Sequence, residues 1–350
     1  PLHALEEGRK ERSTMKTTNA SRILTAGLSR RAFVGASLAS AATLVLAGCN
    51  SGSGSASDSK AASGEKTKIT FCLDYTPNTN HTGIYVAQNK GFFADEGLEV
   101  EAGQAQLGVS YQDYLAAAYD AGNTGLTAVA AVIQHNTSGI MSRAEDGITH
   151  AALMEDHVYT TWDMAVEQAT IKQIMTTDGG DFSKLKMVPF TVDDEVQGLK
   201  ANMFDCVWVY EGWAVQNAAV QDYPVNYFSF KDMDDVFDFY TPVLAANNDF
   251  MKSNPDAVKA FLRAAKKGYE FAVEHPEDAA QILCDEVPEL DSALVEASAK
   301  YLADQYTADA SSWGVIDGKR WAAYFQWLND NDLVENKLDV NAGFDTSYLA

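Results

Sequence analysis

The polar loop from Asp74 to Gly83 has the residue types and the position of a ligand-binding site. It follows the apolar run Ile69 to Leu73 and precedes a helical pattern, Ile84 to Asn89. Open α/β sheets bind ligands where the carboxyl end of a strand leads into the amino end of a helix. The loop offers amide, hydroxyl and imidazole groups, although a surface turn rich in Asn and Thr has the same composition. The loop residues that we expect to contact a ligand are Tyr75, Asn80 and His81.

Further motifs extend from this loop towards the end of the chain. They are Ile84 to Ala87, Gly91 to Phe93, Gly108 to Asp113, Gln134 to Gly139, Asp178 to Phe182, Tyr240 to Leu244 and Ala308 to Ala310. Together with the loop, these motifs resemble the solute-binding proteins for thiamine-precursor pyrimidines, a family related to the eukaryotic-type pyrimidine synthases of thiamine biosynthesis. The resemblance implies a protein that binds a small aminopyrimidine and serves an ABC importer with permease and ATPase subunits.

A second group of candidate ligand residues lies where the apolar run Cys206 to Tyr210 ends. An aminopyrimidine has flat faces and an edge of donors and acceptors, so its site needs aromatic rings and a carboxylate or an amide. Glu211 can accept hydrogen bonds from an exocyclic amine and a protonated ring nitrogen, and the resemblance also places an acidic residue here. A solvated carboxylate at a helix start is the alternative for Glu211. The ligand residues expected in this group are Trp208, Tyr210, Glu211 and Trp213.

Two trios of polar residues follow other predicted strands. Residues 111–113 either line the ligand site or form part of a hinge, and Tyr111 is the one that we expect to contact the ligand. Residues 135–137 lie at the first expected passage between lobes, where we favour a hinge.

Trp162 resembles the cleft tryptophan of the family, but its neighbours differ. Thr160 and Thr161 stand where relatives have glycines, and residues 163–165 stand where relatives have Gly-Ser-Pro. Larger side chains at positions of close backbone approach should reshape the pocket. Glu167 is a possible second carboxylate, and a solvated helix face is its alternative.

The elements that must position these residues follow from apolar runs that alternate with helical or turn segments, which indicates an α/β fold. The expected strands are residues 69–73, 98–100, 106–110, 128–133, 158–162, 185–190 and 206–210, with a helix at 165–175. In the C-terminal third, Asn254 and Pro255 predict a helix start. Apolar residues recur at helical spacing from Val258 to Tyr269, and later helices are expected after Pro276 and over 321–328.

About 300 mature residues favour two lobes, since one core rarely organises so many. The resemblance implies the two-lobe periplasmic-binding-protein fold of the type with two interdomain crossovers and a ligand cleft between the lobes. We expect lobe 1 to comprise residues 68–139 and 240–350, and lobe 2 residues 140–239.

The segment around residues 100–106 conflicts with that fold. Parallel strands need a connection of about a dozen residues, yet only residues 101–104 separate the strand at Val100 from the strand at Leu107. Relatives have a Gly-containing loop and a helix here, so this chain either lacks that unit or pairs its strands differently.

The first fifty residues predict export and a lipid anchor. Residues 29–34, with the pair Arg30-Arg31, open an apolar stretch that ends in Leu46-Ala47-Gly48-Cys49, a twin-arginine signal joined to a lipobox. A lipidated Cys49 would anchor the protein to a membrane without spanning it. We therefore expect residues 1–49 to be the export signal, with translation from Met15, residues 50–67 to be a flexible tether, and the mature protein to be extracytoplasmic.

Cysteine usage and charge exclude other classes of partner. Cys72, Cys206 and Cys284 show no metal-ligand spacing and are expected to be buried free thiols. The formal charge is −23, and residues 1–49 hold 7 Lys/Arg and 3 Asp/Glu, which leaves 19 and 46, or −27, for the remainder. Such a surface repels nucleic acid and anionic lipid. We expect a monomer without a metal or a cofactor.

Two alternative functions share the expected fold. The related pyrimidine synthase has a cysteine-rich cluster just before the counterpart of Val243, whereas Val236 to Tyr240 contains no cysteine, so we expect no catalysis. A binder of riboflavin, sulfonate or nitrate is the other alternative. The acidity of the chain and Glu211 argue against an anion.

Overall fold

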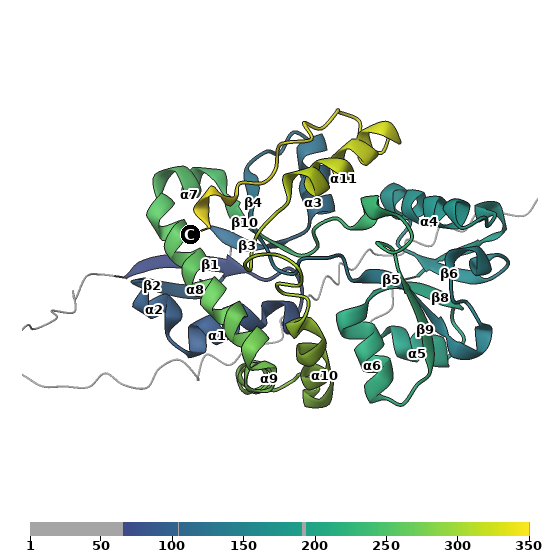
Figure 1. The fold of residues 1–350 in the computed structure, drawn as a ribbon, viewed down its shortest axis with the longest axis horizontal. Coiled ribbons are helices and arrows are strands. Elements are labelled where there is room, and N and C mark those ends of the chain that lie inside the picture. Colours follow the sequence, from purple (N-terminus) through teal and green to yellow (C-terminus); the bar gives the residue numbers. More distant parts are fainter. Residues whose placement is uncertain (1–65, 104, 191–193, 350) are drawn as a thin grey trace, which may run out of the picture. The chain divides into compact units, whose positions relative to one another are not determined.

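Two five-stranded sheets organise the computed structural model, which describes residues 66–103, 105–190 and 194–349 (Figure 1). The first sheet has the order β2 (Leu98–Ala102), β1 (Thr67–Cys72), β3 (Leu107–Ser110), β10 (Val243–Asn247), β4 (Leu126–Ala131). The second has the order β7 (Lys186–Pro189), β6 (Val158–Thr161), β8 (Cys206–Tyr210), β5 (Ser138–Arg143), β9 (Val225–Ser229). Strand β10 is antiparallel to its neighbours, as is β5, and the other pairs are parallel.

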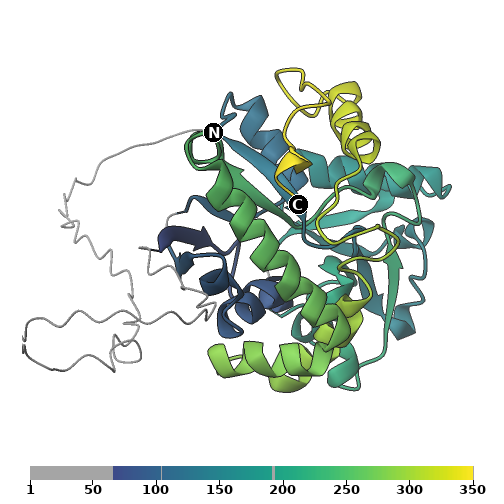
Figure 2. The ribbon, with the colours of Figure 1, turned by 60° about the vertical axis from the view of Figure 1, so that its left-hand side comes forward.

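Helices cover both faces of the first sheet near its centre. On one face lie α1 (Thr82–Asn89), α2 (Phe92–Asp95) and α8 (Pro255–Glu274), and α8 crosses this face in Figure 2. On the other face lie α3 (Gln112–Asp120) and α11 (Gly318–Asp330). The remaining helices from the C-terminal third are α7 (Asn248–Ser253), α9 (Pro276–Glu286) and α10 (Ser292–Ala303). The apolar side chains of α8 that were predicted from their spacing are buried, which confirms that helix.

The second sheet is also covered on both faces. Helix α4 (Ala165–Thr177) packs on one face, against Tyr159 and Cys206. Helices α5 (Glu195–Lys200) and α6 (Gln216–Val220) pack on the other face, against Val207 and Val209. A π-helical turn, Glu211–Val215, joins β8 to α6. Every strand predicted from an apolar run is present, with ends shifted by at most two residues, whereas β5, β9 and β10 were not predicted as strands.

The short connection between β2 and β3 is explained by the register of the first sheet. Phe71 of β1 pairs with Ala102 on one side and with Leu107 on the other. Strand β3 therefore begins at the level where β2 ends, so the chain only crosses the end of β1 and need not return along the sheet. Gln106 holds the crossing in place, because its side-chain oxygen accepts from Thr70 N at 2.6 Å and its backbone N–H donates to Thr70 O at 3.0 Å. The sequence left open either a missing helical unit or a different strand pairing. In the described residues no helix lies between β2 and β3, and both strands pair in parallel with β1, so the missing unit is the possibility that fits.

That loss leaves part of the first sheet uncovered and corrects the prediction for Cys72. Along β1, Ile69 and Phe71 are buried beneath the helices, whereas the side chains that alternate with them, Lys68 and Cys72 among them, are exposed or half-buried. No helix of the described residues between β2 and β3 covers this face, so Cys72 is exposed rather than buried. Cys206 is buried as predicted, and Cys284 is only half-buried, packed against the apolar side chains of α9 and α10.

Some predictions on chain organisation stay predictions. The export signal, Cys49 and residues 50–65 of the expected tether lie outside the described residues. The lobe boundaries near residues 139 and 240 are also untested, although the first sheet draws its strands from residues 67–131 and 243–247 and the second from 138–229. Within the described part of the chain, no helix combines the length and the apolar character that a membrane crossing requires.

Candidate ligand-binding site

The loop after β1 and the start of α3 meet at the carboxyl ends of two neighbouring parallel strands. The hydroxyl of Tyr111 donates to Asp74 Oδ2, and Asp74 Oδ1 lies 2.6 Å from His81 Nε2. Burial alone would raise the pKa of Asp74, but the hydrogen bonds from His81 and Tyr111 outweigh burial and hold that pKa below its usual value. Burial and the charge of Asp74 raise the pKa of Tyr111. Asp74 is therefore an ionised carboxylate fixed by two donors.

His81 is fully buried and both of its ring nitrogens have partners. Its Nδ1 accepts from the backbone N–H of Asn78 at 3.1 Å, so Nε2 carries the hydrogen that binds Asp74. Asn78 in turn caps the following short helical turn by accepting from Asn80 N at 2.9 Å. His81 thus positions Asp74 and the loop, and the described structure leaves it no atom for direct contact with a ligand.

The other two loop residues differ in exposure. Tyr75 exposes 71 % of its surface. Asn80 is half-buried, and its carbonyl oxygen accepts from the hydroxyl of Tyr269 at 2.7 Å, which ties the loop to α8. Both residues remain proposed ligand contacts, Tyr75 as a free aromatic ring and Asn80 through its side-chain amide.

Two tryptophans come together where β6 ends beside the middle of β8. The ring centroids of Trp162 and Trp208 are 5.6 Å apart, and Trp208 packs edge-on against Phe230 at 4.3 Å. Trp162 exposes 45 % of its surface, whereas Trp208 exposes 8 %. The indole Nε1 of Trp208 is enclosed and has no hydrogen-bond partner. The pair therefore offers one open aromatic face and one unpaired donor.

Glu167 holds the tryptophan loop in place. This side chain is 4 % exposed and accepts from Tyr159 Oη at 2.6 Å, from Thr161 Oγ1 at 2.8 Å and from Trp162 N at 3.0 Å. Neither alternative from the sequence is therefore correct, because Glu167 is neither on a solvated face nor free for a ligand. Thr161, where the resemblance implies a glycine, supplies one of these donors and so helps to order the loop around Trp162.

Tyr210 ends β8 of the second sheet, and Asp113 lies in the first turn of α3, which packs on the first sheet. Burial of the hydroxyl raises the pKa of Tyr210, and the charges of Asp113 and Asp74 raise it further. The residue as a whole exposes 38 % of its surface. Burial raises the pKa of Asp113 to about 6, and its Oδ1 is enclosed without a hydrogen-bond partner. Asp113 belongs to the trio that the sequence left as lining or hinge.

Glu211 and Trp213 contact α10 instead of the tryptophan pair. The hydroxyl of Tyr301 donates to Glu211 Oε2 at 2.7 Å. Trp213 packs with apolar side chains of α9 and α10, among them Leu283 and Val295. The residues after β8 turn away because the π-helical turn begins at Glu211, which the sequence pattern did not predict. Of the four residues expected here, Trp208 and Tyr210 lie with Trp162 and Asp113, and Glu211 and Trp213 lie apart from them.

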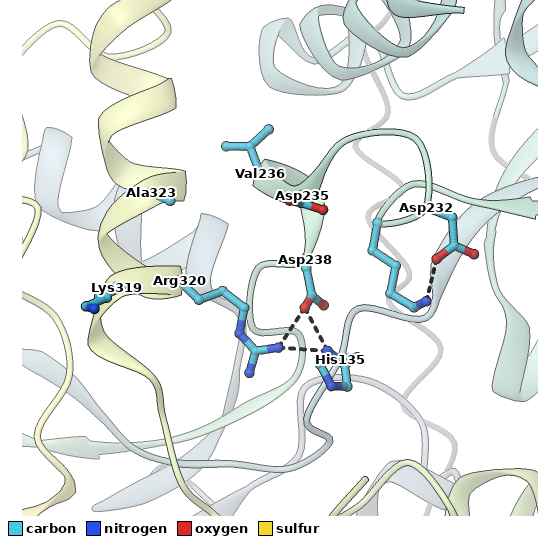
Figure 3. Close-up of a pocket in the computed structure, with 9 residues that line it drawn as sticks. His135, Asp232, Asp235, Val236, Asp238, Lys319, Arg320 and Ala323 are labelled. Atoms are coloured by element: carbon cyan, nitrogen blue, oxygen red, sulfur yellow. Dashed lines mark hydrogen bonds and ion pairs between the residues drawn. The ribbon is translucent and has the colours of Figure 1, made fainter. Parts of the chain in front are cut away.

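A pocket of about 550 Å³ lies beside the two passages of the chain between the sheets (Figure 3). Its lining includes His135, Asp238 and Arg320, and Figure 3 shows these three side chains directed at one another. His135 Nδ1 is 2.7 Å from Asp238 Oδ2 and 2.8 Å from Arg320 Nη1. Asn136 N donates to Asp238 Oδ1 at 2.9 Å, which joins the two passages. These contacts agree with the expected hinge, and the hinge role of residues 135–137 stays a prediction.

The described residues contain no cluster of three or more His, Cys, Asp or Glu side chains that could hold a metal ion. The residues that sequence reasoning missed are Asp74, Tyr301 and the structural role of Glu167. Asp74 carried a detectable signal, since it stands directly after an apolar strand. The pairing of Tyr301 with Glu211 carried none, because it joins residues ninety positions apart.

Comparisons with known proteins show what this chain is similar to. A family model described as NMT1/THI5 like matches residues 78–279. The formylaminopyrimidine-binding protein of Halalkalibacterium halodurans is 25 % identical over 324 residues, which cover 87 % of this chain and 95 % of the relative. A 4-amino-5-hydroxymethyl-2-methylpyrimidine phosphate synthase of Saccharomyces cerevisiae is 23 % identical over 252 residues, which cover 65 % of this chain and 73 % of the relative.

The solved structures show the same fold. The periplasmic aliphatic sulphonate binding protein SsuA from Escherichia coli matches with a TM-score of 0.62 at 14 % identity, and the match covers 78 % of this chain and 96 % of SsuA. At that identity the likeness concerns the fold alone. The two-lobe periplasmic-binding-protein fold predicted from the sequence is therefore confirmed.

Proposed function

Because the chain belongs to the NMT1/THI5-like family, we propose that it is the substrate-binding component of an ABC importer and binds a thiamine-precursor aminopyrimidine. The hydroxymethyl and formylamino pyrimidines are the ligands that we favour. The observation that supports this most is the pair Trp162 and Trp208, which lies where β6 ends beside the parallel strand β8, with one aromatic face open. A flat heterocycle can stack on that face, and Tyr210 and Tyr111 supply further rings nearby.

Polar groups around these rings suit a ligand with donors and acceptors along one edge. Asp74 is ionised, and Asp113 and the indole of Trp208 each carry an enclosed polar atom without a partner. Glu211, the carboxylate favoured by the sequence, is paired with Tyr301. Ligand selectivity should therefore come from a small number of side chains around a mainly aromatic pocket.

A thermal-shift screen tests the proposed ligand class. The full chain is heated with hydroxymethylpyrimidine, formylaminopyrimidine, thiamine, riboflavin and taurine, because a ligand that binds only the folded protein raises the midpoint of unfolding. We expect an aminopyrimidine to give the largest shift. A larger shift with riboflavin or taurine would contradict the proposal and favour another member of the same fold.

The tryptophan pair gives a sharper test by calorimetry. Replacing Trp162 by Ala removes the open stacking face, and base stacking on an aromatic side chain contributes about 1 to 3 kcal/mol, so Trp162→Ala should weaken aminopyrimidine binding by roughly 10- to 100-fold. Met203→Ala is the matched control, since Met203 is similarly exposed and lies in the turn after α5. Equal affinity of Trp162→Ala and the wild type would place the ligand elsewhere.

We further propose that the protein does not catalyse pyrimidine synthesis, although a synthase is among its relatives. The segment Val236 to Tyr240 has no cysteine where the synthases are expected to carry their cluster. Incubation of the purified protein with iron, oxygen and pyridoxal phosphate should yield no hydroxymethylpyrimidine phosphate by mass spectrometry. Stoichiometric product would overturn the binder assignment.

The proposed location is the outer side of the cell membrane. The pair Arg30-Arg31 and the lipobox that ends at Cys49 support export and lipidation. Replacing Cys49 by Ala should abolish incorporation of labelled fatty acid and release the protein from the membrane fraction. Continued membrane retention of Cys49→Ala would show that the anchor is not at this residue.

A further inference from the structure

Asp113 has an unusual position among the carboxylates around the tryptophan pair. It lies in the first turn of α3, and its Oδ1 is enclosed by protein and accepts no hydrogen bond. Asp74 has two side-chain donors, Glu167 has several, and Glu211 has Tyr301. Because enclosed carboxylate oxygens in folded proteins are nearly always paired, the lone oxygen of Asp113 needs an explanation.

Trp208 carries a complementary unpaired group. Its indole Nε1 is a donor, the residue is 8 % exposed, and no acceptor in the described residues pairs with this atom. Indole N–H groups usually find an acceptor when they are buried. The molecule thus presents one unpaired acceptor on the first sheet's side and one unpaired donor on the second sheet's side.

Tyr210 places these two groups at the same site. It follows Trp208 by two positions on β8, so both side chains leave the strand on the same face. Trp208, Tyr324 of α11 and Leu115 of α3 belong to one buried apolar cluster. The charge of Asp113 raises the pKa of Tyr210 and that of Tyr114. Burial raises the pKa of Tyr324 on α11, and the charge of Asp113 raises it further.

We propose that Asp113 is the group that accepts a hydrogen bond from the exocyclic amine of the ligand, and that Trp208 Nε1 donates to a ring nitrogen. This rests on the proposed function, and it identifies the ligand edge as an amine next to an unsubstituted ring nitrogen. An amine donates and a pyridine-type nitrogen accepts, which matches the two unpaired groups in kind. The pKa of Asp113 is raised because burial outweighs the backbone hydrogen bonds from Tyr114 and from Asp113 itself, so a further donor would favour the ionised carboxylate.

Glu211 is the competing carboxylate, because the sequence favoured it and because one of its oxygens remains without a described partner. The position of Glu211 in the structure argues against its contact with the amine of the ligand. Glu211 begins the π-helical turn and binds Tyr301 of α10, whereas Asp113 lies beside Tyr210. The two carboxylates can be separated by a direct comparison.

The experiment measures the affinity of two ligands for four proteins by calorimetry. The ligands are 4-amino-5-hydroxymethyl-2-methylpyrimidine and the same molecule with hydrogen in place of the amine. The proteins are the wild type, Asp113→Asn, Glu211→Gln and the control Glu289→Gln, which changes an exposed carboxylate in the same way. We expect Asp113→Asn to weaken binding of the amine by about 10- to 100-fold and binding of the analogue by less than about 3-fold.

Each other outcome has a definite meaning. If no aminopyrimidine binds the wild type, both the proposed function and the proposed role of Asp113 are wrong. If the wild type binds the amine and Asp113→Asn binds it equally well, only the role of Asp113 is overturned. Equal weakening of both ligands would assign Asp113 a structural role, and a selective loss in Glu211→Gln alone would restore the carboxylate favoured by the sequence.

A comparison within the wild type protects the test against a misfolded variant. If Asp113 binds the amine, the wild type must prefer the amine over its analogue by about tenfold or more. Equal affinities for the two ligands would overturn the proposal without any substitution.

Discussion

The buried carboxyl of Asp113 should make folding of the protein less favourable as the pH rises from acid to neutral. Its pKa is raised from 3.8 to about 6 in the folded chain, mainly by burial. A group whose folded pKa lies above its unfolded value binds its proton more tightly when folded. Its stabilising contribution is present below the unfolded pKa and is lost as the pH rises through the folded pKa. Asp113→Asn removes this titration at nearly constant volume.

The magnitude follows from the shift. About two pKa units at about 1.4 kcal/mol per unit correspond to about 3 kcal/mol of unfolding free energy once both states are ionised. Between about pH 4.5 and about pH 7.5, the unfolding free energy of Asp113→Asn relative to the wild type should therefore rise by about 2 kcal/mol.

Urea unfolding of both proteins over this pH range measures the difference directly. The comparison of variant with wild type cancels the titration of all other carboxylates, provided that they do not interact with Asp113. Glu289→Gln, which changes an exposed carboxylate, should show a difference that hardly depends on pH. If the difference between Asp113→Asn and the wild type is also independent of pH, the carboxyl is ionised in the folded state at both ends of the range, and the reasoning from burial is refuted.

Three further predictions concern packing and reactivity. A Cβ at Gly268 would lie 1.9 Å from the carbonyl oxygen of Gly83, so Gly268→Ala should lower the unfolding free energy measured in urea by at least about 3 kcal/mol. The control Gly125→Ala, at a position with open space around it, should change the unfolding free energy little. Similar values for the two variants would refute the close approach of α1 and α8. Glu167→Gln should lower the unfolding free energy by about 1 to 3 kcal/mol in the same assay and alter tryptophan fluorescence, because the buried donors lose a charged acceptor. An unchanged fluorescence spectrum would show that Glu167 does not order the loop around Trp162. Cys72 should react with a thiol reagent in the native protein, while Cys206 should react only after unfolding. The labelled positions are mapped by mass spectrometry, and equal labelling of both cysteines in the native protein would contradict their assigned burial.

The strands and long helices were predictable from the sequence because their signals are local. Apolar runs such as Cys206 to Tyr210 and the spacing from Val258 to Tyr269 report burial of neighbouring residues, and the structure confirms both elements. Strands β5, β9 and β10 escaped prediction because their residues are buried on both faces or mixed in polarity, so no period of two appears in the sequence.

The candidate site was predictable in position but not in detail. The carboxyl ends of β1, β3, β6 and β8 could be identified, and with them Tyr111, Trp162, Trp208 and Tyr210. The direction of a side chain after the end of a strand depends on the backbone of the next turn, and the π-helical turn at Glu211 gives no sequence signal. Whether a carboxylate is paired depends on residues far away in the chain, as Tyr301 shows for Glu211.

The place of β10 between β3 and β4 affects the order in which the chain can fold. All strands of the second sheet come from the continuous segment 138–229, whereas the first sheet must wait for residues 243–247 to fill its interior position. Until those residues are synthesised, β3 and β4 each have an unpaired edge, the kind of edge that joins other chains in aggregates. Nascent chains that stop before residue 243 should therefore depend on chaperones, while the second sheet can already be complete.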